Sequence, residues 1–498
     1  MTALDPRTPV IIGVGQRNQR THHFTDALNP IQLIAHAARA AGGDAAATAD
    51  PLASLDSIRI VRFLTARHSN PALDLAHELG VTAHEYAITP NGGNSPQSLM
   101  NLTCRQIEAG QLDLALLGGG ECNRTKVLAR RTGTDLGWGH DAPDVDPPVK
   151  LLDELTMSHP YEISLKIYSP IQVYPMNEQA IRHAAGESVA DHQVKVSELW
   201  AGFAAVAAEN PYAAVRSHPT AEEIRTVTHT NRWIGFPYPK MMNSNDRVDQ
   251  SAVLLVASAA KADALGVPRD RWVFPWAGTD AHDTNFVSHR WDFASSPGMR
   301  AAGRGVLELA GIGVDDLAFV DLYSCFPSAV QIAANELGLS LDRPLTITGG
   351  LPFAGGPWNN YVTHSIAAAV GRCRNAPGSI GLISANGGFV TKHAFGIYSS
   401  EPSPHGEFRY THPQSVVDAS PTRLLAEHFA GPATIETYTV MHSGAGEPER
   451  VVAACLTADG SRTWGTSSDT SLAKHMVDTD QMMAACSVEA DSTLRLAD

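Results

Sequence analysis

An internal sequence repeat is the strongest constraint that this sequence places on its fold. Leu116–Gly120 reads as an apolar strand that ends in glycines, and Leu382–Gly388 repeats that pattern in the second part of the chain. Apolar strands of this kind are typical of buried parallel sheets, whose ligands collect at the carboxyl ends of the strands. A repeated supersecondary pattern indicates an internal duplication. We therefore expect two α/β halves that face each other, with the functional site between them.

The order of the expected elements divides the chain into four parts. Strand and helix signals alternate over residues 1–121 and resume over 243–268, which predicts the N-terminal half. Residues 122–242 are rich in proline and lose that alternation, as expected of a loop insertion with a functional role. Residues 269–404 repeat the α/β pattern and predict the C-terminal half. Short β-rich runs over 405–498 predict an extra small antiparallel, barrel-like β-domain.

A glycine turn at Asn91–Ser98 joins a strand expected at Glu85–Ile88 to a helix expected at Pro96–Ala109. Ser95 is a favoured N-cap, and proline fits the first helical position because it gives up no useful hydrogen bond. The free N–H groups at such a helix start suit an anion, an oxyanion or a nucleophile with a lowered pKa. The turn itself supplies no nucleophile.

Charge and cysteine content exclude several classes of function. The net charge is −15 at pH 7 and no basic run is visible, which argues against nucleic-acid binding. The six cysteines show no CxxC pair and no metal-like spacing, so we expect reduced thiols and no metal. No apolar stretch reaches the ~18 residues of a membrane span. In the absence of a recognisable signal at the N-terminus, the expected compartment is the cytoplasm.

Several loop motifs follow one another along the chain in a specific order. They are the turn at Gly93, Leu117–Glu121, Asn243–Ala252, Leu322–Phe326 and Gly349–Pro357. In order and spacing these motifs resemble those of the thiolase superfamily, over roughly residues 8–400. The Cys-Phe pair at the end of the fourth motif is most similar to the sterol-carrier-type branch. The resemblance implies a thiolase fold and a site for an acyl-coenzyme A thioester, with a role in lipid metabolism.

The resemblance does not carry the thiolase chemistry with it. A thiolase needs a cysteine that accepts the acyl group, a second cysteine as acid and base, and a histidine that helps to stabilise the oxyanion. The nucleophile's position is Gly93, the histidine's is Gly356, and the second cysteine's falls near Ser384. Tyr323 replaces the residue that holds the oxyanion water. Because the loss of one member of such a set removes most of the rate, we expect no ordinary acyltransferase activity.

Tyr323, Tyr361 and His393 are the candidate catalytic residues for a different reaction. The phenols could serve as general acids or oxyanion donors, and His393 could serve as a base near neutral pH. Tyr323 could equally be a half-buried tyrosine at a strand end, and His393 a structural histidine. Two functions remain open: an aldolase or lyase that acts on acyl-CoA, and a non-catalytic acyl-CoA binder or scaffold.

Other loop residues are candidates for binding the coenzyme A thioester. Asn386, Gly387 and Gly388 could present an amide and free N–H groups to a thioester carbonyl, and Gly355 lies in a second glycine-rich loop. The glycines could equally serve only to let the two halves pack closely. Cys325 is expected to be a buried, inert thiol. No covalently bound cofactor is expected, and the sequence does not decide between a monomer and a homodimer.

Overall fold

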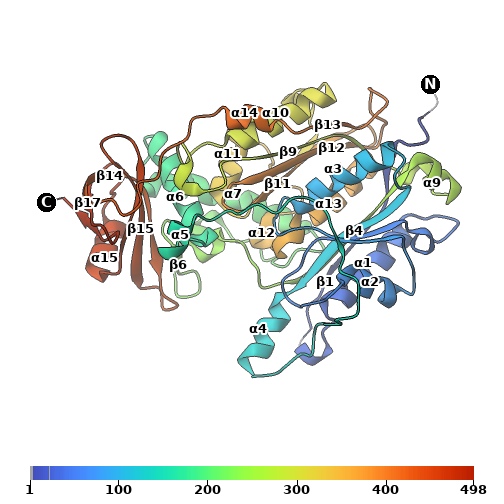
Figure 1. The fold of residues 1–498 in the computed structure, drawn as a ribbon, viewed down its shortest axis with the longest axis horizontal. Coiled ribbons are helices and arrows are strands. Elements are labelled where there is room, and N and C mark those ends of the chain that lie inside the picture. Colours follow the sequence, from blue (N-terminus) through green and yellow to red (C-terminus); the bar gives the residue numbers. More distant parts are fainter. Residues whose placement is uncertain (1–3, 22, 498) are drawn as a thin grey trace.

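The computed structural model describes residues 4–21 and 23–497, and its first sheet is built mainly by the N-terminal part of the chain (Figure 1). The strand order is β1-β8-β4-β2-β3-β5. The strands are Pro9–Asn18 (β1), Ser57–Ile60 (β2), Glu85–Ile88 (β3), Leu114–Cys122 (β4), Val149–Lys150 (β5) and Asp249–Ser258 (β8). Strand β8 runs antiparallel to β1 and β4, whereas β2 is parallel to β3 and β4.

The second sheet repeats this topology. Its order is β10-β11-β12-β9-β13. The strands are Phe274–His282 (β9), Phe319–Asp321 (β10), Ile380–Gly387 (β11), Lys392–Ser399 (β12) and Arg409–Thr411 (β13). Strand β12 is antiparallel to both β9 and β11, and β10 is parallel to β11, so the path β10-β11-β12-β9 repeats β2-β4-β8-β1. The predicted duplication of two α/β halves is confirmed.

Helices cover the outer faces of both sheets and fill the space between them. They are Pro30–Asp44 (α1), Pro71–Leu79 (α2), Ser95–Glu108 (α3), Ala259–Ala264 (α9), Pro297–Ala310 (α10), Pro327–Leu337 (α11), Gly350–Phe353 (α12) and Tyr361–Asn375 (α13). Helices α3 and α13 each contact strands of both sheets and so form the central layer. Because α3 begins at the glycine turn, the position of this helix places the turn between the two halves.

The segment between β4 and β8 contains most of the remaining helices. They are Asn123–Arg131 (α4), Pro160–Ser164 (α5), Pro170–Ala184 (α6), Val189–Glu209 (α7) and Ala221–Arg225 (α8), followed by the short strands Trp233–Gly235 (β6) and Tyr238–Pro239 (β7). Helices α6 and α7 both contact α11, which places this segment against the second half. None of the helices in the described ranges is long and apolar enough to cross a membrane.

The C-terminal strands form a third, antiparallel sheet with the order β16-β15-β14-β17-β18. They are Gly431–His442 (β14), Pro448–Leu456 (β15), Arg462–Ser467 (β16), Ala485–Val488 (β17) and Leu494–Leu496 (β18), accompanied by the helices Gln414–Asp418 (α14) and Thr470–Asp478 (α15). The sheet is not a closed barrel, which corrects the barrel-like expectation. Helix α15 lies between β16 and the short strand β17 in the sequence. In the described part of the chain, the backbone pairing between β16 and the segment before β18 is a single isolated bridge, from Thr466 to Thr493.

Arg462 joins the C-terminal sheet to the second half. Its guanidinium is fully buried and donates to both carboxylate oxygens of Glu436, at 2.7 and 2.8 Å. It also donates to the carbonyl oxygens of Val287 and Ser288, at 3.1 and 3.2 Å. Since a buried cation is tolerated only when its donors are satisfied, this residue fixes the position of the sheet.

Candidate functional site

A cavity of about 520 Å³ opens where the two halves and the α4–α8 segment meet. Seven of the positions singled out in the sequence line it: Gly93, Tyr323, Cys325, Gly356, Asn386, Gly387 and Gly388. The structure therefore brings together loops from both halves, as the duplicated pattern implies. The described residues contain no group of three His, Cys, Asp or Glu side chains that could hold a metal ion.

The phenol of Tyr323 fills the space beside Gly93. A Cβ atom built on Gly93 would lie 2.8 Å from Tyr323 Cζ and closer still to Tyr323 Oη and to the carbonyl oxygen of Asn386. Real Cβ atoms do not approach heavy atoms this closely, so the position admits only glycine as the structure stands. The site that a nucleophilic side chain would need is occupied by a side chain from the other half.

The hydroxyl of Tyr323 makes no hydrogen bond to any residue that the structure describes, although the residue is only 8% exposed and lines the cavity. Its backbone N–H donates to Ser384 Oγ at 2.9 Å, so Ser384 helps to hold the tyrosine in place. Burial raises the pKa of Tyr323 well above its usual value. The phenol is therefore protonated near neutral pH and can donate a hydrogen bond to a ligand.

Tyr361 does not line this cavity. Its ring packs edge-to-face against Tyr323, with centroids 5.6 Å apart, but its hydroxyl lies 2.6 Å from Thr348 Oγ1 and 3.3 Å from Asp321 Oδ2. Burial raises the pKa of Tyr361 far above its usual value. The residue supports the orientation of Tyr323, and its placement does not favour a role in proton transfer to a ligand.

His393 also lies outside the lining of the cavity. It is 1% exposed, and its Nε2 lies 2.8 Å from Asp283 Oδ2 and 3.3 Å from Ser296 Oγ. Burial alone would raise the pKa of the Asp283 carboxyl, but the hydrogen bond to His393, the charges of His393 and Arg290 and the hydrogen bond from Ser296 together lower that pKa. This geometry is that of a buried structural pair, so the placement does not favour His393 as a base.

Lys392, the neighbour of His393 on β12, is the residue that adjoins the turn. Its Nζ donates to the carbonyl oxygen of Asn91, and a Cβ on Gly92 would lie 2.7 Å from that Nζ. Burial lowers the pKa of Lys392 to about 8, against the opposing effect of Glu154. Because successive residues of a strand point to opposite faces, the position of β12 decides which of the pair faces the turn. The sequence alone did not reveal this strand.

Asn386 lines the cavity and is held in place by the α4–α8 segment. Its Nδ2 donates to Tyr174 Oη at 2.9 Å, and Tyr174 Oη donates to the carbonyl oxygen of Gly388 at 3.0 Å. Asn386 Oδ1 has no partner among the described residues. Tyr174 also stacks on Phe326 with centroids 4.5 Å apart. This tyrosine positions the loop after β11, and no motif in the sequence pointed to it.

The remaining predicted positions differ in their relation to the cavity. Gly355 does not line it, and its φ of +119° together with a side-chain clash against Gln250 explains the glycine by local packing. Gly356 does line it, and a Cβ there would lie 3.4 Å or more from its neighbours, so no clash excludes a side chain. Burial raises the pKa of the Cys325 thiol to about 12, as expected of an inert cysteine.

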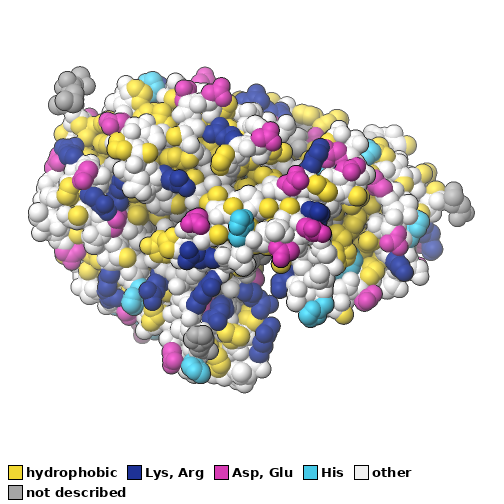
Figure 2. Space-filling model, turned by 180° about the vertical axis from the view of Figure 1, so that it is seen from behind, with side chains coloured by type: hydrophobic (Ala, Val, Ile, Leu, Met, Phe, Trp, Pro, Cys, Tyr) yellow, Lys and Arg dark blue, Asp and Glu magenta, His cyan; other side chains and the backbone are white. Residues whose placement is uncertain are grey.

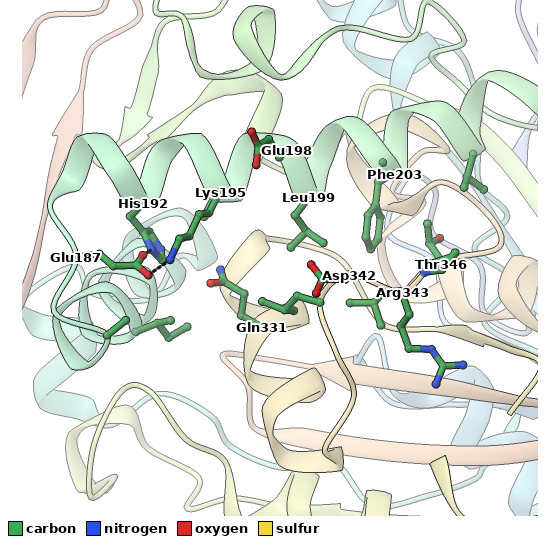
Figure 3. Close-up of a pocket in the computed structure, with 18 residues that line it drawn as sticks. Glu187, His192, Lys195, Glu198, Leu199, Phe203, Gln331, Asp342, Arg343 and Thr346 are labelled. Atoms are coloured by element: carbon green, nitrogen blue, oxygen red, sulfur yellow. Dashed lines mark hydrogen bonds and ion pairs between the residues drawn. The ribbon is translucent and has the colours of Figure 1, made fainter. Parts of the chain in front are cut away.

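A second and larger cavity of about 720 Å³ lies between α7, α11 and residues 341–346 (Figure 3). His192 stands at one end, with its Nε2 2.5 Å from Glu178 Oε1 and its Nδ1 2.7 Å from Glu187 Oε2. Lys195 is paired with Glu187 as well. Since these charges satisfy one another and none of the predicted site residues lines this cavity, we assign the functional site to the cavity at Gly93.

Comparison with known proteins agrees with this architecture. Residues 413–493 match the family model described as the thiolase-like protein type 1 additional C-terminal domain. The monomeric SCP2-thiolase like protein type 1 (STLP1) from Mycobacterium smegmatis is 34% identical, with a TM-score of 0.84 over 99% of this chain and 100% of that chain. No curated protein matches the chain.

More distant solved structures share the fold over a smaller part of the chain. The dimeric peroxisomal thiolase of Saccharomyces cerevisiae is 16% identical, with a TM-score of 0.56 over 80% of this chain and 99% of that one. The Ltp2-ChsH2(DUF35) aldolase is 17% identical, with a TM-score of 0.57 over 80% of this chain and 99% of that one. The chain thus belongs to the thiolase superfamily, as a member of the SCP2-thiolase-like proteins of type 1.

Proposed function

We propose that this protein binds an acyl-CoA thioester and does not carry out the ordinary thiolase reaction. One observation carries the proposal: the hydroxyl of Tyr323 lies where the nucleophilic side chain at residue 93 would have to be. A thiolase cannot form its acyl-enzyme without that side chain. The site keeps a cavity while the group that would attack the thioester is absent.

The lining of the cavity supports a thioester ligand. Met157, Ile171, Leu351 and Phe389 contribute apolar surface for an acyl chain. The hydroxyl of Tyr323 is available as a hydrogen-bond donor, and a thioester carbonyl is the kind of acceptor it can serve. We place the carbonyl between this hydroxyl and the turn, and the acyl chain along the apolar wall. We also place the protein in cytoplasmic lipid metabolism.

A catalytic alternative rests on the same tyrosine. A protonated phenol with no hydrogen-bond partner among the described residues is a suitable general acid for cleavage of a carbon–carbon bond next to a thioester. The protein named as the Ltp2-ChsH2(DUF35) aldolase shares the fold, which makes an aldolase or lyase the second candidate. In a non-catalytic binder or scaffold the same hydroxyl only holds the ligand. Tyr361 and His393 have no part in either version, since both are engaged elsewhere.

Isothermal titration calorimetry with CoA and with a series of acyl-CoA thioesters tests the proposal. We expect saturable binding of the thioesters and no turnover of acetoacetyl-CoA with CoA in a thiolysis assay. Ordinary thiolytic turnover would overturn the assignment, and so would the absence of binding across the series. Incubation of β-hydroxyacyl-CoA thioesters followed by product analysis separates the lyase from the binder.

A further inference from the structure

Aromatic side chains are concentrated in the wall of the cavity at Gly93. Six of its 24 lining residues are aromatic, namely Tyr168, Tyr174, Tyr323, Phe326, Trp358 and Phe389. Aromatic residues make up only 7% of the whole chain. The larger cavity between α7 and α11 has one aromatic residue, Phe203, among its 18 lining residues. The enrichment in aromatic rings is therefore a property of the candidate site and not of cavities in this protein generally.

These six rings differ in whether they already pack against another aromatic ring. Tyr174 and Phe326 stack on each other, and Tyr323 packs edge-to-face against Tyr361. In the part of the chain that the structure describes, Tyr168, Trp358 and Phe389 contact no other aromatic ring closely enough to form such a pair. Of these three, Phe389 is buried, whereas Tyr168 is 55% and Trp358 45% exposed. The rings of Tyr168 and Trp358 are thus accessible to a ligand.

Trp358 has a strained backbone that its neighbours hold in place. Its φ is +45°, in the left-handed region that bulky residues rarely adopt. Its N–H donates to the carbonyl oxygen of Gly356 at 2.8 Å. The next residue, Asn359, accepts from the N–H of Gly92 at 3.0 Å and donates to the carbonyl oxygen of Arg62 at 2.8 Å. Strain of this kind persists only where the surroundings fix it, and it is concentrated at sites that contact ligands.

Neither the backbone nor the core accounts for a tryptophan at this position. Glycine adopts a positive φ without strain, so the backbone alone would favour glycine. A tryptophan that served the core would be buried, as Trp200, Trp272 and Trp464 are. Trp358 instead combines the least favourable backbone for its size with a half-exposed ring in the wall of a cavity. A contact between the indole and a ligand would account for this combination.

Trp358 adjoins the apolar wall along which we place the acyl chain. The N–H of Gly356 donates to the carbonyl oxygen of Asn245 at 2.8 Å, and the N–H of Asn245 donates to the carbonyl oxygen of Leu351 at 3.2 Å. A Cβ atom built on Gly356 would lie 3.5 Å from Leu351 Cδ2. The loop therefore folds back on itself, and Trp358 follows two residues after the point where it meets Leu351.

The cavity is flanked by the start of α4 on one side and by the loop before α6 on another. Lys126 of α4 donates to the carbonyl oxygen of Leu64, which lines the cavity. Arg450 of the C-terminal sheet donates to the carbonyl oxygen of Lys166, two residues before Tyr168. Figure 2 shows a notch between the lower projection, where Figure 1 places α4, and the lobe of the C-terminal sheet. A ligand can approach the exposed aromatic rings from this side.

An aromatic ring on the ligand would use this wall better than a saturated group. Aromatic rings that pack against each other gain more than the burial of their area, whereas a saturated group gains the burial alone. We propose that the ligand is an acyl-CoA thioester whose acyl group carries an aromatic ring, and that the indole of Trp358 packs against that ring. This inference rests on the proposed acyl-CoA function and names the class of acyl group and a residue that recognises it.

The test uses three probes in isothermal titration calorimetry: 3-phenylpropanoyl-CoA, 3-cyclohexylpropanoyl-CoA and CoA. The two thioesters differ only in the saturation of the ring. We expect the unmodified chain to bind the phenyl compound about three- to tenfold more tightly than the cyclohexyl compound. Trp358→Leu keeps an apolar side chain and the strained backbone, so this variant should bind both thioesters equally and CoA as the unmodified chain does.

Two further variants separate recognition from folding. Trp358→Gly relieves the strain at φ +45°, so it should fold even if the leucine variant does not, and it too should lose the preference for the phenyl compound. Trp291→Leu is the matched control, because Trp291 is 49% exposed and lies outside the lining of the cavity. This control should keep the preference. Urea unfolding of each variant shows that it is folded.

Several outcomes would overturn the inference. Equal binding of the two thioesters by the unmodified chain refutes it and leaves the proposed function intact. A preference that survives in both Trp358 variants shows that the indole does not recognise the ring. If the Trp358 variants lose affinity for CoA as much as for the thioesters, the indole contacts the coenzyme and not the acyl group. If the unmodified chain binds none of the probes, the proposed function and this inference both fail.

Discussion

The Tyr323 hydroxyl lies inside the volume that a side chain at Gly93 would occupy. The two residues come from opposite halves of the duplicated fold, and they meet at the start of the central helix α3. The phenol of Tyr323 and the carbonyl oxygen of Asn386 both lie within the space that a Cβ atom at residue 93 would need. A substitution of Gly93 should therefore alter the stability of the protein, which can be measured by unfolding.

Gly93→Ala should destabilise the protein by about 1–3 kcal/mol, because the added methyl group overlaps Tyr323 and the backbone of Asn386. Urea unfolding monitored by fluorescence gives the change in midpoint. Gly356→Ala is the matched control, since a Cβ there has 3.4 Å of room, and we expect it to be close to neutral. Equal stability of the two variants would contradict the steric argument.

Tyr323→Phe should leave stability nearly unchanged, because the hydroxyl has no hydrogen-bond partner among the residues described. Affinity for an acyl-CoA thioester should fall about fivefold, as expected for the loss of one hydrogen bond of about 1 kcal/mol. Tyr361→Phe should show the opposite pattern, with lost stability and unchanged affinity, since its hydroxyl bonds Thr348. Calorimetric titration and urea unfolding of both variants decide between these patterns.

His393→Gln should cost about 2 kcal/mol of stability, because Asp283 loses a partner inside the protein. The pKa of Asp283 is lowered in the folded chain, so its contribution to stability is present above the pKa of the unfolded state and is lost as pH falls through the folded pKa. Without His393 that pKa rises, and unfolding on acidification should begin at a higher pH. If the variant instead lost ligand binding and kept its stability, His393 would have a role in the site, and the structural assignment would be wrong.

His192→Gln should destabilise the protein more at pH 6 than at pH 9. Burial disfavours the charge of His192, but hydrogen bonds to Glu178 and Glu187 outweigh it and raise the pKa. A raised pKa stabilises the fold fully below the pKa of the unfolded state, about 6.5, and the effect is lost as pH rises through the folded pKa. Unfolding free energies of both proteins across this range give the difference, and a difference independent of pH would contradict the charged arrangement.

Arg462→Lys should cost about 3 kcal/mol or more, because Glu436 and four carbonyl oxygens of the second half would lose donors that a lysine cannot replace. Arg495→Lys is the control, since that arginine is exposed and pairs with Glu489 at the surface. We expect no measurable effect there. Thermal unfolding followed by scanning calorimetry shows whether the C-terminal sheet melts separately in the Arg462 variant.

Sequence patterns were sufficient to predict the duplicated halves and most of the loops that line the cavity between them. Apolar strands such as Leu114–Cys122 are nearly continuous, and helix starts such as Asn29 before Pro30 carry recognisable caps, so local chemistry fixes them. The direction of single side chains depends on contacts far apart in the chain. Strand β12 places Lys392 against the turn and His393 against Asp283, and neither contact has a local signal.

The directions of the Tyr361 and Tyr174 hydroxyl groups could not be predicted for the same reason. Both are buried tyrosines near the loops of the site, yet Tyr361 directs its hydroxyl to Thr348 while Tyr174 reaches the loop at Gly388. Nothing in the residues that flank either tyrosine distinguishes these orientations. A buried polar group can be expected to have a hydrogen-bond partner, but the identity of that partner is set by tertiary packing.

Strand β6 and helix α6 connect the C-terminal sheet to the segment that lines the cavity. Residue Gly235 of β6 pairs with Met441 of β14, and Thr437 Oγ1 donates to the carbonyl oxygen of Met176 in α6. The helix that carries Tyr174 is therefore anchored by strands that follow it by more than two hundred residues in the sequence. During synthesis α6 therefore lacks these contacts until residues 431–442 have emerged from the ribosome and folded onto it.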